Sequence, residues 1–243
     1  MKKRAMLFIF VILILSTVTS FAENPIKLKN VAVGEVSFGH YEQDNNLENG
    51  PEPIEWIVLH VTDDKALLLS KYGLDAKPYN TEWKDVSWET CTLRTWLNSD
   101  FLSEAFSKKE RSAILTTIVD NSSSQGYSWW QEPFSGNDTQ DQIFLLSYKE
   151  AEQYLNVTVE DENNIKSRVA PTSYAIAHRA WFSFEKQTEE GKNAGMWWLR
   201  SPGYKENIAL CVYSDGSLFG VCGVFSDYSL VRPALWLSLK SII

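Results

Sequence analysis

The chain has 243 residues, of which 44% are hydrophobic and 22% are charged, and 31 Asp and Glu against 23 Lys and Arg give it a formal net charge of −8 at pH 7. An acidic surface repels the phosphates of nucleic acids and the headgroups of anionic lipids, so neither is an expected partner. The hydrophobic content is sufficient for the core of one β-rich domain.

The first residues predict export. Basic residues at 2–4 precede an apolar stretch over 6–15, and Ser20-Phe21-Ala22 has the small-x-small pattern of a cleavage site. The apolar stretch is shorter than the roughly 20 residues that span a bilayer, which favours a cleaved signal peptide over the alternative, a membrane anchor. We therefore expect a signal peptide at residues 1–22 and a single exported domain at residues 23–243.

Cleavage would change both the charge and the location of the protein. It would leave 20 Lys and Arg against 31 Asp and Glu, a net charge of −11. The expected location is extracellular or periplasmic, with no membrane insertion after cleavage.

Strands dominate the first part of the mature chain. Alternating patterns predict strands at residues 31–38, 54–61 and 66–70, with an acidic, amide-rich loop at 41–53 and a tight turn at 62–65. The last two strands should form a hairpin.

Helices occupy the middle of the chain. Leu93, Trp96, Leu97 and Phe101 have helical spacing, and two capping boxes predict further helices, Ser107 with Glu110 and Ser147 with Glu150. Strands are predicted at 114–119 and 143–146, and Pro171 is expected to open a last helix that runs to Ala177.

Strands return at 196–200, 208–213, 218–225 and 235–239, and no internal repeat is visible. This order lacks the βαβ alternation of parallel sheets. The predicted fold class is α+β, a single domain with antiparallel sheets built from both chain ends and helices in the middle.

The three cysteines allow at most one intramolecular bridge. Cys211 and Cys222 flank a predicted turn at 214–217, so a cross-strand disulfide is one hypothesis and a pair of small buried hydrophobes is the other. Cys91 stands where a helix begins, which can lower the pKa of a thiol. Burial as a packing residue is the favoured interpretation.

Several strings in a fixed order resemble a known family. Over nearly the whole mature chain the sequence is similar to the bacterial family of domain of unknown function 6273, whose members are exported or surface-associated and have no assigned chemistry. The strings that carry the resemblance are Glu52-Pro53-Ile54-Glu55-Trp56, Leu69-Ser70-Lys71-Tyr72-Gly73-Leu74-Asp75, residues 88–98, Trp197-Trp198-Leu199-Arg200-Ser201-Pro202-Gly203 and Val231-Arg232-Pro233-Ala234-Leu235-Trp236-Leu237.

The last quarter also resembles the ending of C-type-lectin-like domains, including the formylglycine-generating group. A tryptophan-rich strand, a hairpin and a closing strand carry this resemblance, which implies a C-type-lectin-like fold. The chain departs from calcium-binding lectins because it has no Trp-Asn-Asp string and Glu132-Pro133 lacks a following Asn. It departs from the formylglycine-generating oxidases because Cys211 and Cys222 are too widely spaced.

Catalytic constellations are poorly supported. His40, His60 and His178 lack metal-ligand spacing, and no G-x-S-x-G string is present. Carboxylates suited to glycoside hydrolysis occur at Glu52, Glu55, Asp63 and Asp64, but such pairs arise by chance in an acidic chain. We assign no catalytic residue, no metal ligand and no cofactor.

Candidate ligand-binding residues come from two regions. The polar stretch 121–140 contains Tyr127, Trp129, Trp130 and Phe134, whose rings could stack on a ligand or could instead hold the loop against the core. Trp198 and Arg200 could line a cleft, although strand alternation lets only one of Trp197 and Trp198 face it, and arginines such as Arg200 and Arg232 often pair internally.

The sequence thus predicts an exported, non-catalytic recognition or surface-interaction module whose ligand is a glycan or an extracellular protein. The alternative is an extracellular enzyme. It would be a carbohydrate-active hydrolase or a redox enzyme related to the formylglycine-generating group.

Overall fold

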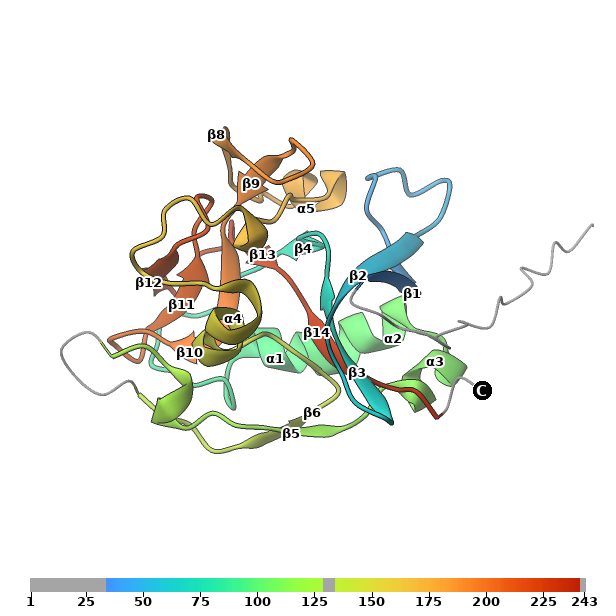
Figure 1. The fold of residues 1–243 in the computed structure, drawn as a ribbon, viewed down its shortest axis with the longest axis horizontal. Coiled ribbons are helices and arrows are strands. Elements are labelled where there is room, and N and C mark those ends of the chain that lie inside the picture. The colour runs from blue at the N-terminus through green and yellow to red at the C-terminus, as the bar shows by residue number, and fades with distance from the viewer. Residues whose placement is uncertain (1–33, 129–133, 241–243) are drawn as a thin grey trace, which may run out of the picture.

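A computed structural model describes residues 34–128 and 134–240 (Figure 1). They form one α+β domain, because a single cluster of buried hydrophobic residues contains side chains from both of its five-stranded sheets. The predicted fold class, α+β in a single domain, is confirmed at this level.

The first sheet contains strands from both parts of the chain. Its order is β1-β2-β3-β14-β7, and every pair is antiparallel. β14 lies between β3 and β7, with Leu235 opposite both Leu68 and Ile143. The bounds are β1 (Glu35–Tyr41), β2 (Glu52–Val61), β3 (Lys65–Ser70), β7 (Ile143–Phe144) and β14 (Ala234–Ser238).

The second sheet has the order β12-β11-β10-β13-β4. Its pairs are antiparallel as expected, except that β10 and β13 run parallel. The bounds are β4 (Asp75–Ala76), β10 (Trp197–Pro202), β11 (Ile208–Val212), β12 (Leu218–Gly223) and β13 (Leu230–Val231).

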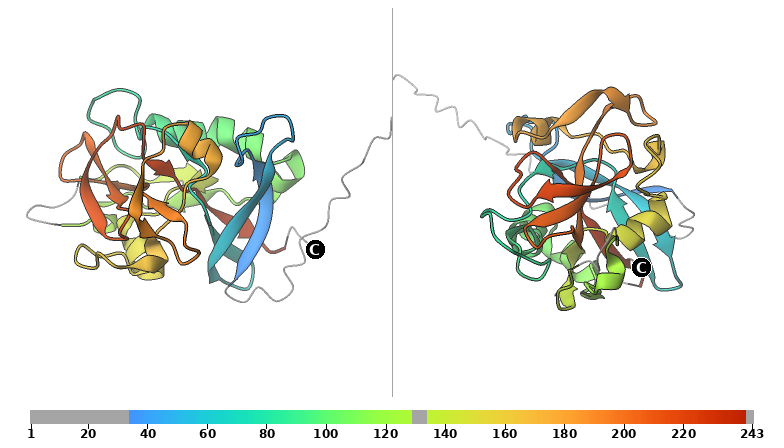
Figure 2. Two further views of the ribbon diagram at one scale, coloured as in Figure 1. Left: turned by 90° about the horizontal axis from the view of Figure 1, so that it is seen from above. Right: turned by 90° about the vertical axis from the view of Figure 1, so that its left-hand side faces the viewer.

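Arg232 and Pro233 carry the chain from the second sheet to the first. They connect β13 directly to β14, so the same short segment completes both sheets. Seen from above in Figure 2, the strands of the two sheets occupy different ends of the long axis, and the red C-terminal strand runs between them. Proline suits this position because it fixes the backbone angle and Pro233 needs no ladder donor.

The helices are short and are capped as the sequence predicts. Both capping boxes are present, at Ser107 and Ser147. The helix predicted around Trp96 continues through a π-helical segment at Leu97–Phe101. The α-helices are α1 (Thr92–Trp96), α2 (Leu102–Ala105), α3 (Lys108–Ala113), α4 (Tyr148–Leu155) and α5 (Ser173–Ala177).

Pro171 does not open α5. The N-cap is Thr172, whose hydroxyl accepts a hydrogen bond from the backbone N–H of Ala175 at 3.0 Å. A threonine oxygen at this position satisfies a free helix donor, which a proline cannot do.

Two small two-stranded sheets complete the fold. β5 (Thr117–Val119) pairs with β6 (Thr139–Asp141), and β8 (Phe182–Gln187) pairs with β9 (Asn193–Gly195). The sequence patterns do not predict β8 and β9. Phe184 on β8 is 80% exposed, so this hairpin buries little apolar surface.

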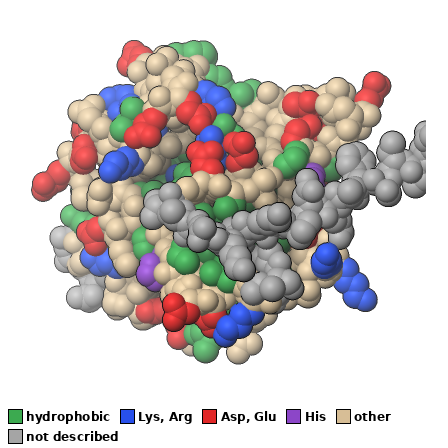
Figure 3. Space-filling view, turned by 45° about the vertical axis from the view of Figure 1, so that its right-hand side comes forward, with side chains coloured by type: hydrophobic (Ala, Val, Ile, Leu, Met, Phe, Trp, Pro, Cys, Tyr) green, Lys and Arg blue, Asp and Glu red, His purple; other side chains and the backbone are tan. Residues whose placement is uncertain are grey.

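Within the described residues, no helix has the length and apolar character needed to span a bilayer. The face in Figure 3 carries groups of acidic side chains with Lys and Arg among them, in keeping with the acidic composition. The signal peptide predicted at 1–22 lies outside the described residues.

Candidate binding pocket

A cavity of about 400 Å³ is formed by residues from four parts of the chain. It lies where β10 ends, beside the short 3-10 helix Ser123–Gln125 and the strand connections before α1 and β6. Its lining is Asp85, Val86, Ser87, Trp88, Glu89, Thr90, Asp120, Asn121, Ser122, Gln125, Phe134, Ser135, Gly136, Asn137, Arg200, Ser201, Pro202 and Glu206.

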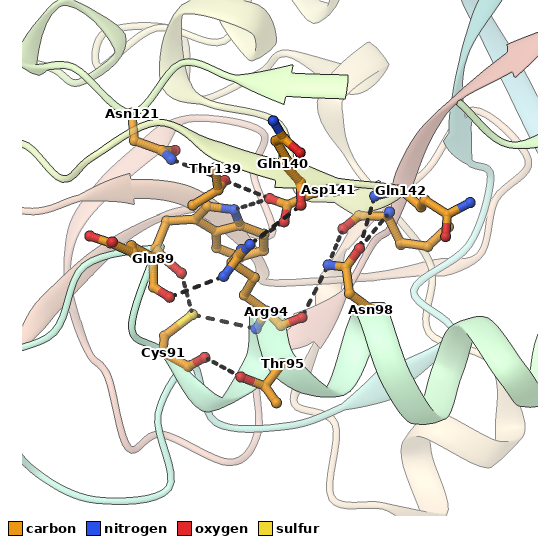
Figure 4. A network of polar contacts seen from close by, with 12 residues as sticks. Glu89, Cys91, Arg94, Thr95, Asn98, Asn121, Thr139, Gln140, Asp141 and Gln142 are labelled. Carbon is orange, nitrogen blue, oxygen red and sulfur yellow. Dashed lines mark hydrogen bonds and ion pairs between the residues drawn. The ribbon is translucent and has the colours of Figure 1, made fainter. Parts of the chain in front are cut away.

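A buried carboxylate fixes one wall of this pocket. Asp141 accepts hydrogen bonds from Trp88 Nε1 at 2.9 Å and Thr139 Oγ1 at 2.7 Å, and it pairs with Arg94 Nε at 2.7 Å (Figure 4). Because Asp141 is 1% exposed, its charge depends on these donors. The ring of Trp88 is thereby held in place at the side of the pocket.

The two loops that form this wall are also bonded directly. Asn137 Nδ2 donates to a carboxylate oxygen of Glu89 at 3.0 Å, and Arg94 Nη1 donates to the Glu89 carbonyl at 3.2 Å. Arg94 belongs to α1 and Asn137 to the segment before β6. These bonds preorganise the lining before any ligand arrives.

Arg200 fixes the opposite wall from β10. Its guanidinium pairs with the Glu150 carboxylate and donates to the carbonyls of Leu145 at 2.9 Å and Asp120 at 3.1 Å. Glu150 also accepts from the backbone N–H of Ser147 at the start of α4. One carboxylate therefore caps a helix and compensates a buried cation.

Two buried polar atoms of lining residues have no hydrogen-bond partner among the described residues. They are Asn121 Oδ1, an acceptor, and Arg200 Nε, a donor. A buried polar group without a partner is costly, so such atoms mark places where a polar molecule gains by binding. Their residues belong to the Asp120–Gln125 loop and to β10, which line one side of the cavity.

The pocket is acidic. Asp85, Glu89, Asp120 and Glu206 line it, whereas the charge of Arg200 is compensated by Glu150. Hydrogen bonds from Ser122, followed by that from Gln125, lower the pKa of Asp120 below its ordinary value. Asp120 is thus an ionised acceptor at neutral pH.

The predicted ligand-binding residues are divided by the structure. Phe134 and Arg200 line the pocket, and Tyr127 is half-buried with its ring 5.3 Å from that of Tyr148. Trp198 is fully buried and donates to the carbonyl of Lys77 at 2.9 Å, so it presents no ring face to a ligand and we leave it out of the site. Trp129 and Trp130 lie outside the described residues.

The cysteines have structural roles. A disulfide joins Cys211 on β11 to Cys222 on β12. Burial raises the pKa of the Cys91 thiol to about 12, and its sulfur caps α1 by accepting from the backbone N–H of Arg94 at 3.4 Å. Such a thiol is not an activated nucleophile.

The carboxylates that the sequence offered for hydrolysis, Glu52, Glu55, Asp63 and Asp64, do not line the pocket. Oxygens of Glu42, Asp44 and Glu52 lie within 4.8 Å of one another, but these carboxylates accept backbone N–H groups of their own loop. The sequence analysis did not identify Asp85, Glu89, Asp120 and Glu206, which line the pocket, because nothing local marks them in an acidic chain.

Comparison with known proteins gives one match. The family model described as "Domain of unknown function (DUF6273)" matches residues 63–239. No curated protein and no solved structure matches the chain. The matched region covers both sheets except β1 and β2, and it includes the whole pocket. The chain therefore belongs to the DUF6273 family of domains of unknown function.

Proposed function

We propose that this protein is a non-catalytic recognition domain whose pocket binds a glycan. The observation that carries the proposal is the composition of the cavity of about 400 Å³, which is lined by residues with hydroxyl, amide and carboxylate groups and by Phe134. Binding sites for small molecules combine an apolar surface with a few convergent polar groups, and this cavity has both.

The polar groups suit sugar hydroxyls. Ser87, Thr90, Ser122 and Ser135 offer groups that donate and accept, while Asn121, Gln125 and Asn137 offer amides. An aromatic ring can stack against the C–H face of a pyranose, and the half-buried Phe134 supplies such a ring.

The charge of the pocket selects among glycans. Its carboxylates repel uronic and sialic acids, and Arg200 cannot offset them because Glu150 already compensates it. We therefore expect a neutral or amino-bearing sugar as the ligand.

The remaining parts of the proposal come from the sequence. We propose that residues 1–22 direct export and are removed, that residues 23–243 act outside the cytoplasm, and that the scaffold is C-type-lectin-like. Long loops on a sheet scaffold suit recognition in that class of fold.

Hydrolysis is the second candidate, and the carboxylates that line the pocket favour it. Glycoside hydrolysis needs one carboxyl group that is protonated and a second that is ionised. Asp120, with its lowered pKa, suits only the second role. A redox enzyme is not favoured, because the disulfide joins two of the three cysteines and Cys91 is buried.

The test is a glycan array with neutral, amino-bearing and acidic sugars, followed by calorimetry on the best ligand. Phe134→Ala should weaken binding by about tenfold, the magnitude of a lost stacking contact, without a large change in melting temperature. Phe184→Ala removes an exposed ring from β8 and is the matched control.

Three results would redirect the proposal. Equal affinity of the Phe134→Ala variant would place the ligand elsewhere. Binding to a protein but to no sugar would leave recognition with a different ligand class. Release of reducing sugar, lost in Asp120→Asn, would show a hydrolase.

A further inference from the structure

A second cavity, of about 120 Å³, lies near the turn of the β8–β9 hairpin and shares no lining residue with the pocket described above. Its lining includes Lys71, Lys166, Arg168 and Arg232 on the cationic side and Glu35, Glu189 and Glu190 on the anionic side. In a chain with a net charge of −8, this concentration of cations is unusual.

Arg232 is the most informative of these residues. It is 1% exposed, its Nε donates to the carbonyl of Ser70 at 2.9 Å, and its Nη1 lies 3.5 Å from the carbonyl of Ser167. No Asp or Glu in the described part of the chain forms an ion pair with it. The only cause of its altered pKa is burial, which lowers that pKa to about 9, so the guanidinium is cationic at neutral pH.

A buried cation without a counter-charge carries a large desolvation cost. The two carbonyls and the Trp197 ring, whose centroid is 4.9 Å from Arg232 Cζ, offset part of it. Neither carbonyl accepts a hydrogen bond from Nη2 of Arg232. The N–H groups of Nη2 can therefore donate to an oxyanion.

The other cations of the cavity differ in how they are paired. Lys71 lies 2.7 Å from Glu190 and 2.9 Å from Glu35, so its charge is already compensated. Arg168 donates only to the carbonyls of Asp215 and Gln187, and Lys166 is exposed. Lys166 and Arg168 thus add to the positive potential that Arg232 creates.

We propose that this cavity binds a small carboxylate, held by the free side of the Arg232 guanidinium and supported by Lys166 and Arg168. Arginine prefers bidentate, planar oxyanions. The three carboxylates that also line the cavity oppose a dianion, and the volume suits a ligand no larger than a few heavy atoms. A singly charged carboxylate, from a free acid or from the end of a peptide, meets these conditions.

The proposal is tested on the purified full protein labelled with ¹⁵N-arginine. The Nε–Hε resonance of Arg232, assigned by its loss in Arg232→Lys, is followed while acetate replaces chloride at constant ionic strength. We expect a saturable shift with a Kd on the order of 1–10 mM, a plausible affinity for a ligand of four heavy atoms. N-acetylalanine in a second titration tests whether the terminus of a peptide also fits.

Lys166→Gln keeps the test independent of any folding defect in the Arg232 variant. It should weaken acetate binding by about threefold, because one exposed charge near the ligand is removed. Lys149→Gln, on the exposed face of α4, is the control and should leave the Kd unchanged.

Three outcomes would overturn the proposal. A shift that rises linearly with acetate would show no site. The same titration with phosphate in place of acetate should give a weaker response, and an equal or stronger one would contradict selection for a single charge. Unchanged affinity in Lys166→Gln would place the acetate away from this cavity.

Discussion

Arg200 and Arg232 come from two strings that each contain an arginine and a proline, and both side chains are buried, but only one of them has a carboxylate partner. Arg200 pairs with the Glu150 carboxylate and two carbonyls, whereas Arg232 bonds only to carbonyls. A compensated guanidinium holds loops together. An uncompensated guanidinium keeps a positive charge that an anionic ligand can bind.

The largest expected effect comes from breaking the compensated pair. Glu150→Gln keeps an oxygen for the Ser147 N–H but leaves Arg200 without a counter-charge, so the free energy of unfolding should fall by about 3 kcal/mol. Urea denaturation measures this change. Glu152→Gln, in the same helix and paired with exposed Lys149, should cost less than about 1 kcal/mol. Equal losses in the two variants would mean that the Arg200 pair is no stronger than a surface pair.

An intermediate effect, a difference of about 2 kcal/mol between two variants, is expected when each arginine is replaced by methionine. Arg200→Met leaves the carbonyls of Leu145 and Asp120 without their donor and should cost about 3 kcal/mol. Arg232→Met also removes an uncompensated charge, which offsets part of the lost bonding, so its cost should be about 1 kcal/mol. Both values come from the midpoints of urea unfolding curves. The reverse order would contradict the comparison.

The smallest effect concerns the paired cation beside Arg232. Lys71 lowers the pKa of Glu190 to about 2, from an ordinary value of 4.5. A carboxyl with a lowered pKa in the folded state stabilises the fold above pH 4.5 and loses that contribution as the pH falls toward 2. Because Glu190 is 41% exposed, the contribution should stay below about 1 kcal/mol.

The Glu190→Gln variant should therefore be less stable than the wild type at pH 4.5, and this difference in stability should shrink as the pH falls to 2. Thermal unfolding of both proteins measures the difference. Glu189→Gln removes the same charge one residue earlier and breaks none of these contacts, so it serves as the control. A gap that widens as the pH falls would contradict the assigned role of Lys71.

Local signals in the sequence predict the local parts of this fold. The capping boxes at Ser107 and Ser147 depend only on residues three apart, and the β2–β3 hairpin depends on alternation and a short turn. Both are confirmed. The β8–β9 hairpin was missed because Phe184 is exposed there, so apolar alternation does not mark a buried face.

The sites depend on long-range geometry and were predicted less well. Phe134 was identified because an aromatic residue stands out in a polar loop, and it does line the pocket. Trp198 was also a candidate, but its ring is buried in the core. The lack of a carboxylate beside Arg232 is a property of distant segments around Ser70 and Ser167, and the neighbouring sequence gives no sign of it.

The passage through Arg232 and Pro233 also bears on when the protein can fold. β13 and β14 occupy interior positions in their respective sheets, so the second sheet is not complete before residue 231 has been synthesised and the first not before residue 238. Until then β3 and β10 each lack a neighbouring strand. Most residue contacts of the folded chain join positions that are distant in sequence, which slows folding. A chain truncated before β13 should therefore leave both sheets without an interior strand, even though it keeps nearly all of the buried residues before that point.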